Sequence, residues 1–158
     1  MSFDSGEFRN ALGNFTTGIC VVTTHSDDHT ACGMTINSFA SVSLTPPLVL
    51  WSLQDDSHCL GIFESAETFV INVLAADQHA LSSRYATKDS HQLDPQHYRI
   101  GVSGEPVIRG ALASFECRRW AQYPGGDHII LVGEVVAVEH NSNKAPLVFN
   151  SGQYRELR

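Results

Sequence analysis

Short runs of β-branched and apolar residues recur along this chain, and no long helical segments alternate with them. The clearest runs are Gly18 to Thr24, Leu48 to Leu53, Phe69 to Leu74, Ala111 to Ala121 and His128 to Glu139. A doubly wound α/β sheet is excluded, because each of its strands is followed by a helix. The pattern predicts an all-β fold with a few helices, built from antiparallel strands and most simply arranged as a barrel.

Prolines and glycines mark the ends of these strands. The small, hydroxylic and β-branched residues from Ala31 to Leu44 form a further run that stops at Thr45-Pro46-Pro47, where proline cannot continue a central ladder. The segment from Tyr123 to Asp127 contains Pro-Gly-Gly and joins the last two runs as a hairpin would.

Helical periodicity is limited to three segments, Asp4 to Phe15, Ser57 to Ala66 and Asp77 to Ala86. The first opens with Asp-x-x-Glu, which resembles a capping box. The span from Thr87 to Gly110 shows little periodicity, so we expect a long surface excursion of the kind that often forms a lid.

Composition places the chain among ordinary globular proteins. Its 158 residues are 42% hydrophobic and 17% charged, which predicts a single domain over residues 1–158. A formal net charge of −7 with no run of Lys or Arg argues against a nucleic-acid partner. No apolar stretch approaches the roughly 20 residues of a membrane span, and the start lacks the features of a signal peptide. We therefore expect no membrane partner and a cytoplasmic location.

Four cysteines stand singly in apolar surroundings: Cys20, Cys32, Cys59 and Cys117. With no C-x-x-C pair, the sequence predicts buried reduced thiols and no metal site. A reactive Cys59 beside His58 is the alternative, which is disfavoured because neighbours on a strand point to opposite faces.

Two stretches carry candidate chemistry. The residues from Gly33 to Leu50 combine hydroxyl and amide groups with a diproline, which suits a polar planar ligand such as a flavin. The alternative is a half-exposed strand whose Ser and Thr side chains face water. There is no G-x-G-x-x-G, so a nicotinamide nucleotide would bind without a Rossmann unit.

The second stretch is Gly126-Asp127-His128, at the expected hairpin turn. His128 precedes the apolar residues Ile129 to Val132, which would let it project from a barrel rim into a pocket. The alternative is a turn histidine satisfied by local backbone.

Several short sequence motifs occur along the chain in an order that is typical of one protein family. They are F-R-x-A-L-G-x-F-T-T-G from Phe8, the Gly33 to Leu48 run, Phe69 to Leu74, Gly110 to Ala113, Glu116-Cys117, G-D-H-x-I from Gly126, Gly133 to Val135, and Pro146-Leu147. Together they closely resemble the flavin reductase-like family, short NAD(P)H:flavin oxidoreductases that serve as reductase components of two-component flavin-dependent monooxygenases. The resemblance runs from about Phe8 to Tyr154.

The resemblance implies an FMN-binding split β-barrel with Greek-key connections, forming a homodimer. It implies hydride transfer from NADH or NADPH to FMN or FAD, with the reduced flavin diffusing to a partner monooxygenase. The flavin-binding positions it implies are Thr35, Ile36, Asn37, Ser38, Ser52, Leu53, Gln54, Ser57 and His58. His128 would lie near the nicotinamide as the catalytic candidate, positioning and polarising rather than exchanging protons, with Tyr154 as a second nicotinamide contact.

Two features depart from the family pattern. The segment from Thr87 to Pro95 lacks the expected glycine and phenylalanine, which leaves flavin or lid contacts there open. The sequence ends at Arg158, so we expect no regulatory C-terminal domain of the kind some relatives carry. The alternative function is a non-catalytic flavin-binding protein, or a reductase with another electron acceptor, on the same barrel.

Overall fold

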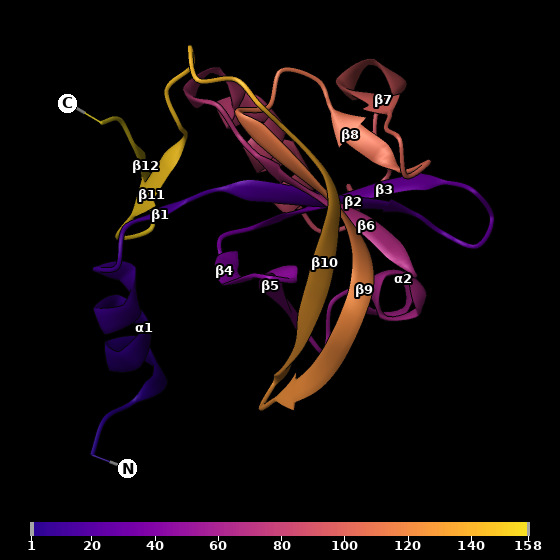
Figure 1. The fold of residues 1–158 in the computed structure, drawn as a ribbon. Helices are drawn as coiled ribbons and strands as arrows, with labels where there is room; N and C mark the ends of the chain where they lie inside the picture. The colour runs from indigo at the N-terminus through magenta and orange to yellow at the C-terminus, as the bar shows by residue number, and fades with distance from the viewer. Residues whose placement is uncertain (1, 158) are drawn as a thin grey trace.

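The structure is a computed structural model that describes residues 2–157, and it is built mostly of antiparallel strands with few helices (Figure 1). In chain order the elements are α1 (Ser5–Gly13), β1 (Thr17–Gly18), β2 (Cys20–His25), β3 (Ala31–Ile36), β4 (Ala40–Leu44), β5 (Pro47–Gln54), α2 (Leu60–Ser65), β6 (Thr68–Val73), η1 (Ala76–Gln78), α3 (His79–Ala86), η2 (Pro95–His97), β7 (Tyr98–Ile100), β8 (Pro106–Ile108), β9 (Ala113–Gly125), β10 (His128–His140), β11 (Val148–Asn150) and β12 (Gln153–Arg155).

The main sheet has seven strands in the order β3-β2-β6-β9-β10-β5-β4, and every pair is antiparallel. Two small sheets accompany it, β1-β11-β12 and β7-β8. The prediction of a mainly antiparallel β fold with a few helices is confirmed. Strands β3 and β4 are consecutive in the chain yet lie at opposite edges of the main sheet, and no ladder joins them within residues 2–157. Closure into a split barrel with Greek-key connections stays a prediction.

The run from Ala31 to Leu44 is two strands rather than one continuous strand. It breaks at Asn37 and Ser38 because Ile36 and Phe39, on either side, both turn inward to the core. The ring of Phe39 stacks on that of Phe115 with centroids 5.5 Å apart. This break lets β3 and β4 join opposite edges of the sheet, and it leaves the residues between them beside the site described below.

The larger core lies around Trp51 on β5. Its ring meets Phe63 of α2 edge-on at a centroid distance of 5.1 Å, and all of Trp51, Phe63 and Phe69 are fully buried. Strands β2 and β6 are covered on both faces, which explains their nearly continuous apolar sequences. Burial of this kind contributes roughly 25 cal/mol per Å² of apolar surface.

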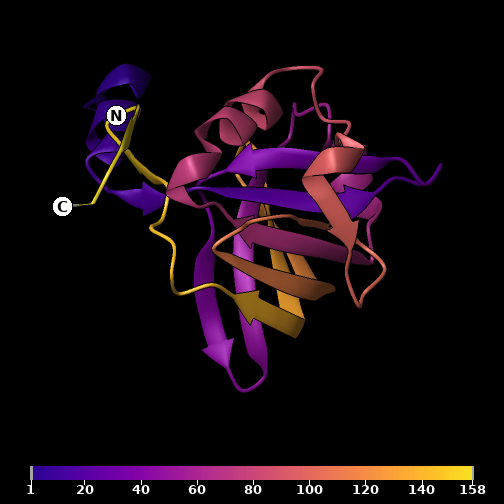
Figure 2. The same cartoon turned by 90° about the horizontal axis from the view of Figure 1, so that it is seen from above.

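A second core lies on the other face of β2 and includes part of the expected surface excursion. Leu93, Val107 and Ile108 are each at most 3% exposed, and Leu93 and Ile108 pack in a cluster with Tyr85 and Leu147. Figure 2 shows α3 lying over β2 and β3 on this side. The segment from Thr87 to Gly110 is thus a surface excursion for most of its length, as predicted, but it is anchored to the core at Leu93 and at Pro106 to Ile108. The few apolar residues of this segment are spaced irregularly, so no periodic pattern in the sequence indicated which of them are buried.

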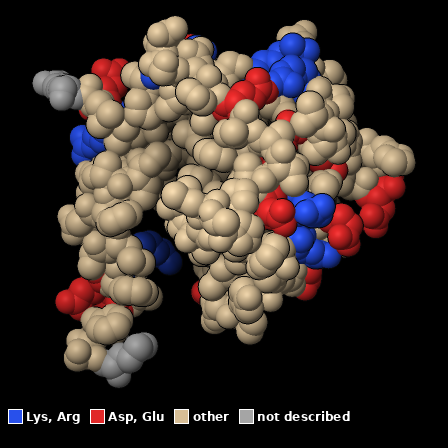
Figure 3. All heavy atoms as spheres, viewed as in Figure 1, with Lys and Arg blue, Asp and Glu red and all other residues tan. Residues whose placement is uncertain are grey.

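Helix α1 begins as the sequence predicts, but its apolar side is uncovered. Oδ1 of Asp4 accepts a hydrogen bond of 2.7 Å from the Glu7 amide. Phe8 and Leu12 on the helix, and Phe15 just after its end, are 52%, 57% and 78% exposed. Figure 3 shows the helix standing apart from the rest of the molecule across a notch.

The long β9-β10 hairpin has turn chemistry at its tip and a close contact in its middle. Gly126 has φ 69°, in the left-handed region that glycine adopts without strain. At Gly133, beside a register shift, a Cβ atom would lie 2.8 Å from Phe69 and from Cys117. None of the helices in the described chain is long and apolar enough to cross a membrane.

Candidate functional site

Two adjoining cavities lie where β3, the turn after β5 and helix α3 meet. The first, of about 390 Å³, is lined by Met34, Thr35, Gln54, Asp56, Ser57, His58, Tyr85, Ala86, Lys88 and His91. The second, of about 210 Å³, is lined by Ile19, Thr35, Ile36, Asn37, Ala86, Phe149 and Tyr154. Thr35 and Ala86 line both, so the cavities are neighbours across a shared wall. The larger is of a size common among small-molecule sites, ~300–1,000 Å³.

Strand β3 offers unpaired backbone to these cavities because it is an edge strand. Its outer side is covered only at its beginning, where the Leu93 amide donates to Ala31 O at 2.8 Å and the Gly33 amide donates to His91 O at 2.8 Å. Within residues 2–157, no backbone group continues this pairing beyond Gly33. The N–H and C=O groups that follow on this outer side are therefore available to a ligand with a polar edge.

Helix α3 and the C-terminal strands fix the apolar end. The Thr35 hydroxyl donates to Ser82 O at 2.7 Å, and the hydroxyls of Ser82 and Tyr154 share a hydrogen bond of 2.8 Å. The Tyr154 ring also meets His79 edge-on, with centroids 4.0 Å apart, and Phe149 at 5.8 Å. These contacts hold an aromatic wall beside Ile36.

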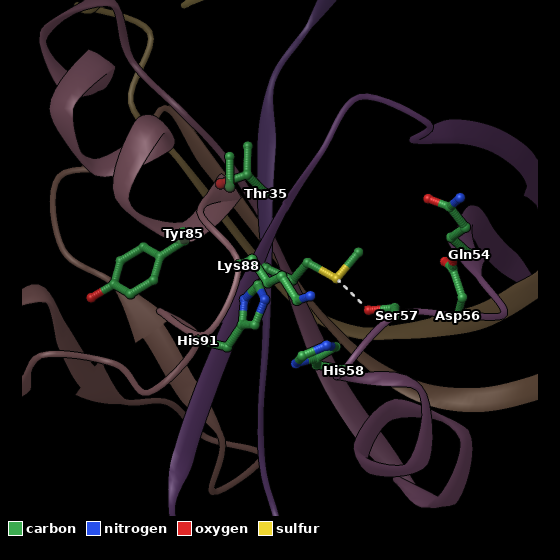
Figure 4. A pocket seen from close by; sticks show the side chains of 10 residues that line it. Thr35, Gln54, Asp56, Ser57, His58, Tyr85, Lys88 and His91 are labelled. Atoms are coloured by element: carbon green, nitrogen blue, oxygen red, sulfur yellow. Dashed lines mark hydrogen bonds between the residues drawn. The ribbon is translucent and has the colours of Figure 1, made fainter.

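The turn after β5 and the segment after α3 form the polar end. The turn is closed by the Ser57 amide donating to Gln54 O at 3.1 Å, and it is tied to the β9-β10 hairpin by the Asp55 amide donating to Asp127 O at 2.9 Å. In Figure 4, Lys88, His91 and His58 gather in one part of the first cavity. Gln54 and Asp56 lie together on the opposite side of Ser57, and the Tyr85 ring points away.

The predicted flavin-binding residues divide into two groups. Thr35, Gln54, Ser57 and His58 line the first cavity, and Ile36 and Asn37 join Thr35 in the second. The remaining three make contacts within the protein. The Ser38 hydroxyl accepts from the Ser52 amide at 2.9 Å and donates to Ser52 O at 3.2 Å, extending the β4-β5 ladder by a side chain. The Leu53 side chain is fully buried in the core, so only its backbone could meet a ligand.

The two predicted nicotinamide contacts are placed differently. Tyr154 lines the second cavity. His128 lines neither cavity, but it pairs across the sheet with Gln54, so the two side chains share a face at the rim of the first cavity. Nδ1 of His128 lies 2.7 Å from Oδ1 of Asp127, and this hydrogen bond, with the charge of the imidazole, lowers the pKa of Asp127.

Sequence reasoning missed part of the cavity lining. Met34, Asp56, Tyr85, Ala86, Lys88 and His91 complete the first cavity, and Ile19 and Phe149 the second. A signal existed for Lys88 and His91, since they are basic residues in an acidic chain and lie in the segment that departs from the family pattern. Ile19 and Phe149 look like ordinary strand residues, so nothing in the sequence marked them.

The cysteines behave as the sequence predicts, all four being buried and unpaired in disulfides. Burial is the main reason that the pKa of Cys59 is raised from 9.0 to about 11. A thiol with so high a pKa is a poor nucleophile at neutral pH. The hydrogen bond that its amide donates to the Ser57 hydroxyl, 3.1 Å, gives Cys59 a structural role in the turn.

Comparison with known proteins gives a consistent family. Residues 12–158 match the Flavin reductase like domain. The chain belongs to the flavin reductase-like family. Its curated relatives include the FMN reductase (NADH) SmoA of Agrobacterium fabrum, 49% identical over 96% of this chain and 85% of the relative. HsaB of Rhodococcus jostii, the reductase subunit of a flavin-dependent monooxygenase, is 33% identical over 97% of this chain and 78% of its own.

A solved flavin reductase has nearly the same backbone. The NADH:FAD oxidoreductase SgcE6 of Streptomyces globisporus, in complex with NAD and FAD fragments, superposes with a TM-score of 0.92 at 35% identity, covering 98% of this chain and 93% of that one. The predicted family membership is confirmed. The cofactors named for these relatives are the flavin and nicotinamide nucleotides that the sequence predicts.

Proposed function

We propose that this chain is an NAD(P)H:flavin oxidoreductase that reduces FMN or FAD and supplies the reduced flavin to a partner monooxygenase. The observation that carries the proposal is the pair of adjoining cavities at the free edge of β3, one with polar and cationic residues and one with aromatic and aliphatic residues. A flavin mononucleotide has the same division into a charged phosphate and a flat ring. The activities of SmoA, HsaB and SgcE6 support the same reading.

The residues present fit a flavin. Backbone groups of β3 beyond Gly33 and the Asn37 amide would meet the hydrogen-bonding edge of the ring, since Asn37 is exposed at the second cavity. Ile36, Phe149 and Tyr154 would pack against its apolar part. Lys88, with His58 and His91, would hold the phosphate.

The reaction asks the protein for position rather than for reactive side chains. The hydride transfer itself would be the chemistry of the bound flavin and nicotinamide. His128, held by Asp127 at the rim beside Gln54, would orient the nicotinamide over the ring. Neither a nucleophilic cysteine nor a paired acid and base is needed.

Finer features of the proposal follow from the family resemblance. The chain would form one domain with a split-barrel sheet and act as a homodimer. The exposed apolar side of α1 supports the dimer, because a surface of Phe8, Leu12 and Phe15 is stabilised when a second copy covers it. Light scattering at micromolar concentration should give twice the chain mass. A monomer with full activity would refute the dimer.

The activity is tested by following nicotinamide absorbance while purified protein is mixed with NADH or NADPH, oxygen and free FMN or FAD. We expect oxidation of the nicotinamide nucleotide that depends on both protein and added flavin, and the faster pairs define the preferred cofactors. Tight flavin binding without any nicotinamide oxidation would instead favour the non-catalytic flavin-binding protein.

A further inference from the structure

A contact between an imidazole and a carboxylate lies beside the polar end of the first cavity. Nδ1 of His58, on the turn after β5, lies 2.8 Å from Oδ1 of Asp89, on the segment after α3. The attraction between these two groups is electrostatic and acts when the imidazole is protonated. The contact therefore joins His58, which lines the cavity, to the segment that carries Lys88 and His91.

The carboxylate of Asp89 contacts a lining residue at the end of the cavity where an anion would bind. His58, Lys88 and His91 all line this cavity, and Figure 4 shows them gathered together. Asp56, an acidic residue that lines the cavity, lies with Gln54 on the far side of Ser57. Asp89 follows Lys88 in the chain and is paired with His58, so its carboxylate lies close to the end of the cavity where a phosphate would bind.

The Asp89–His58 contact contributes little to the stability of the fold, so a ligand can replace Asp89 at low cost. The side chains of His58 and Asp89 are 51% and 72% exposed, so the pair is screened by water and contributes little to stability. Asp89 has φ 66°, a left-handed conformation that Asp and Asn tolerate better than most residues. The local backbone therefore places this carboxylate beside His58 at modest cost.

We propose that Asp89 is an internal competitor for the flavin phosphate, occupying His58 until the phosphate displaces it. The phosphate takes over the His58 donor, and Asp89 remains nearby as a like charge that weakens its binding. This contact sets how weakly a phosphorylated flavin is held, so that flavin exchanges as a substrate instead of staying as a prosthetic group. The inference rests on the proposed function, because it assigns the cationic end of the site to a flavin phosphate.

The test compares FMN with riboflavin, which has the same ring and no phosphate. Dissociation constants for both are measured by quenching of flavin fluorescence in the full chain and in Asp89→Asn, which removes the charge and suits the same φ. Asp77→Asn is the matched control, because Asp77 is also an exposed carboxylate (71%) paired with a cation, Lys144 at 3.7 Å, and lies away from both cavities. Asp89→Gly, which φ 66° also permits, repeats the test if the Asn variant melts at a lower temperature.

We expect Asp89→Asn to tighten FMN about three- to tenfold, a range suited to a screened charge pair. Riboflavin affinity should stay within about twofold, as should both affinities in Asp77→Asn. An unchanged ratio of FMN to riboflavin affinity in both Asp89 variants, or weaker FMN binding, overturns the proposal. A change in the KM for NADH with no change in FMN affinity would also overturn it, by assigning the cationic end to the nicotinamide nucleotide. Failure of the proposed function looks different. The parent protein itself would then bind neither FMN nor riboflavin, or it would not oxidise NADH.

Discussion

The neighbours Asn37 and Ser38 give a sharp contrast between a residue that we expect to bind ligand and one that is bonded to the protein. Within the described chain, the Asn37 side chain makes no hydrogen bond and faces the second cavity, while Ser38 holds both backbone groups of Ser52 at 2.9 and 3.2 Å. Replacing Ser38 by Ala leaves a half-buried amide and carbonyl without this partner, which costs about 1–2 kcal/mol. For a chain of this size that is a fall in Tm of roughly 2–8 °C.

Asn37→Ala should behave in the opposite way. Its melting temperature should change little, because an exposed side chain without protein partners contributes within ~0.5 kcal/mol. Its FMN affinity should fall by about 5- to 150-fold, the equivalent of losing one ligand hydrogen bond worth ~1–3 kcal/mol. Thermal melts and FMN titrations of the two variants decide the matter. The reasoning is refuted if Ser38→Ala binds FMN poorly at an unchanged Tm while Asn37→Ala binds it like the parent.

Three further outcomes are expected. Asn72→Leu removes a fully buried amide that donates to Val21 O at 2.9 Å and accepts from the Ile108 amide at 3.0 Å. Denaturant unfolding should show that the free energy of unfolding falls by about 3–5 kcal/mol, and a fall below ~1 kcal/mol would contradict this role. Burial raises the pKa of the Cys20 thiol from 9.0 to about 12, so between these pH values the thiol ionises only in the unfolded state and the stability of the fold should decrease as pH rises. A Cys20→Ala variant that loses the same stability between pH 9 and 12 would argue against this contribution of Cys20. His128→Ala should slow reduction of bound flavin by on the order of 100-fold in stopped-flow mixing with NADH, at nearly unchanged FMN affinity, whereas a lower Tm with normal reduction would make His128 a turn residue only.

Most of the strand pattern could be predicted from the sequence because local chemistry decides it. The β-branched runs became β2, β5, β6, β9 and β10, and the glycine turn at Gly126 closed the hairpin as expected. The break at Asn37 and Ser38 could not be predicted from composition, since it depends on Ile36 and Phe39 finding places in the core. The anchoring of the segment after α3 by Leu93 and Ile108 likewise depends on a distant cluster.

Site residues could be predicted where they belong to a recognisable motif. They could not be predicted where tertiary contacts determine which side chains reach the cavity. Thr35 and Asn37 line the cavities as the polar strand suggested. Ser38 belongs to the same motif, yet its hydroxyl is taken by a strand fourteen residues further along the chain. Lys88 and His91 reach the cavity only because the chain after α3 folds back to pair with β3 at Gly33, a contact no local pattern encodes.

A crystal structure with FMN bound is the most direct measurement of where this protein holds its flavin. We predict density for the ring at the free edge of β3 beside Ile36 and Tyr154, with the phosphate at Lys88 and His58, and the Asp89 carboxylate moved off His58. Flavin bound elsewhere, with both cavities filled only by water at saturating FMN, would contradict the site and the function derived from it.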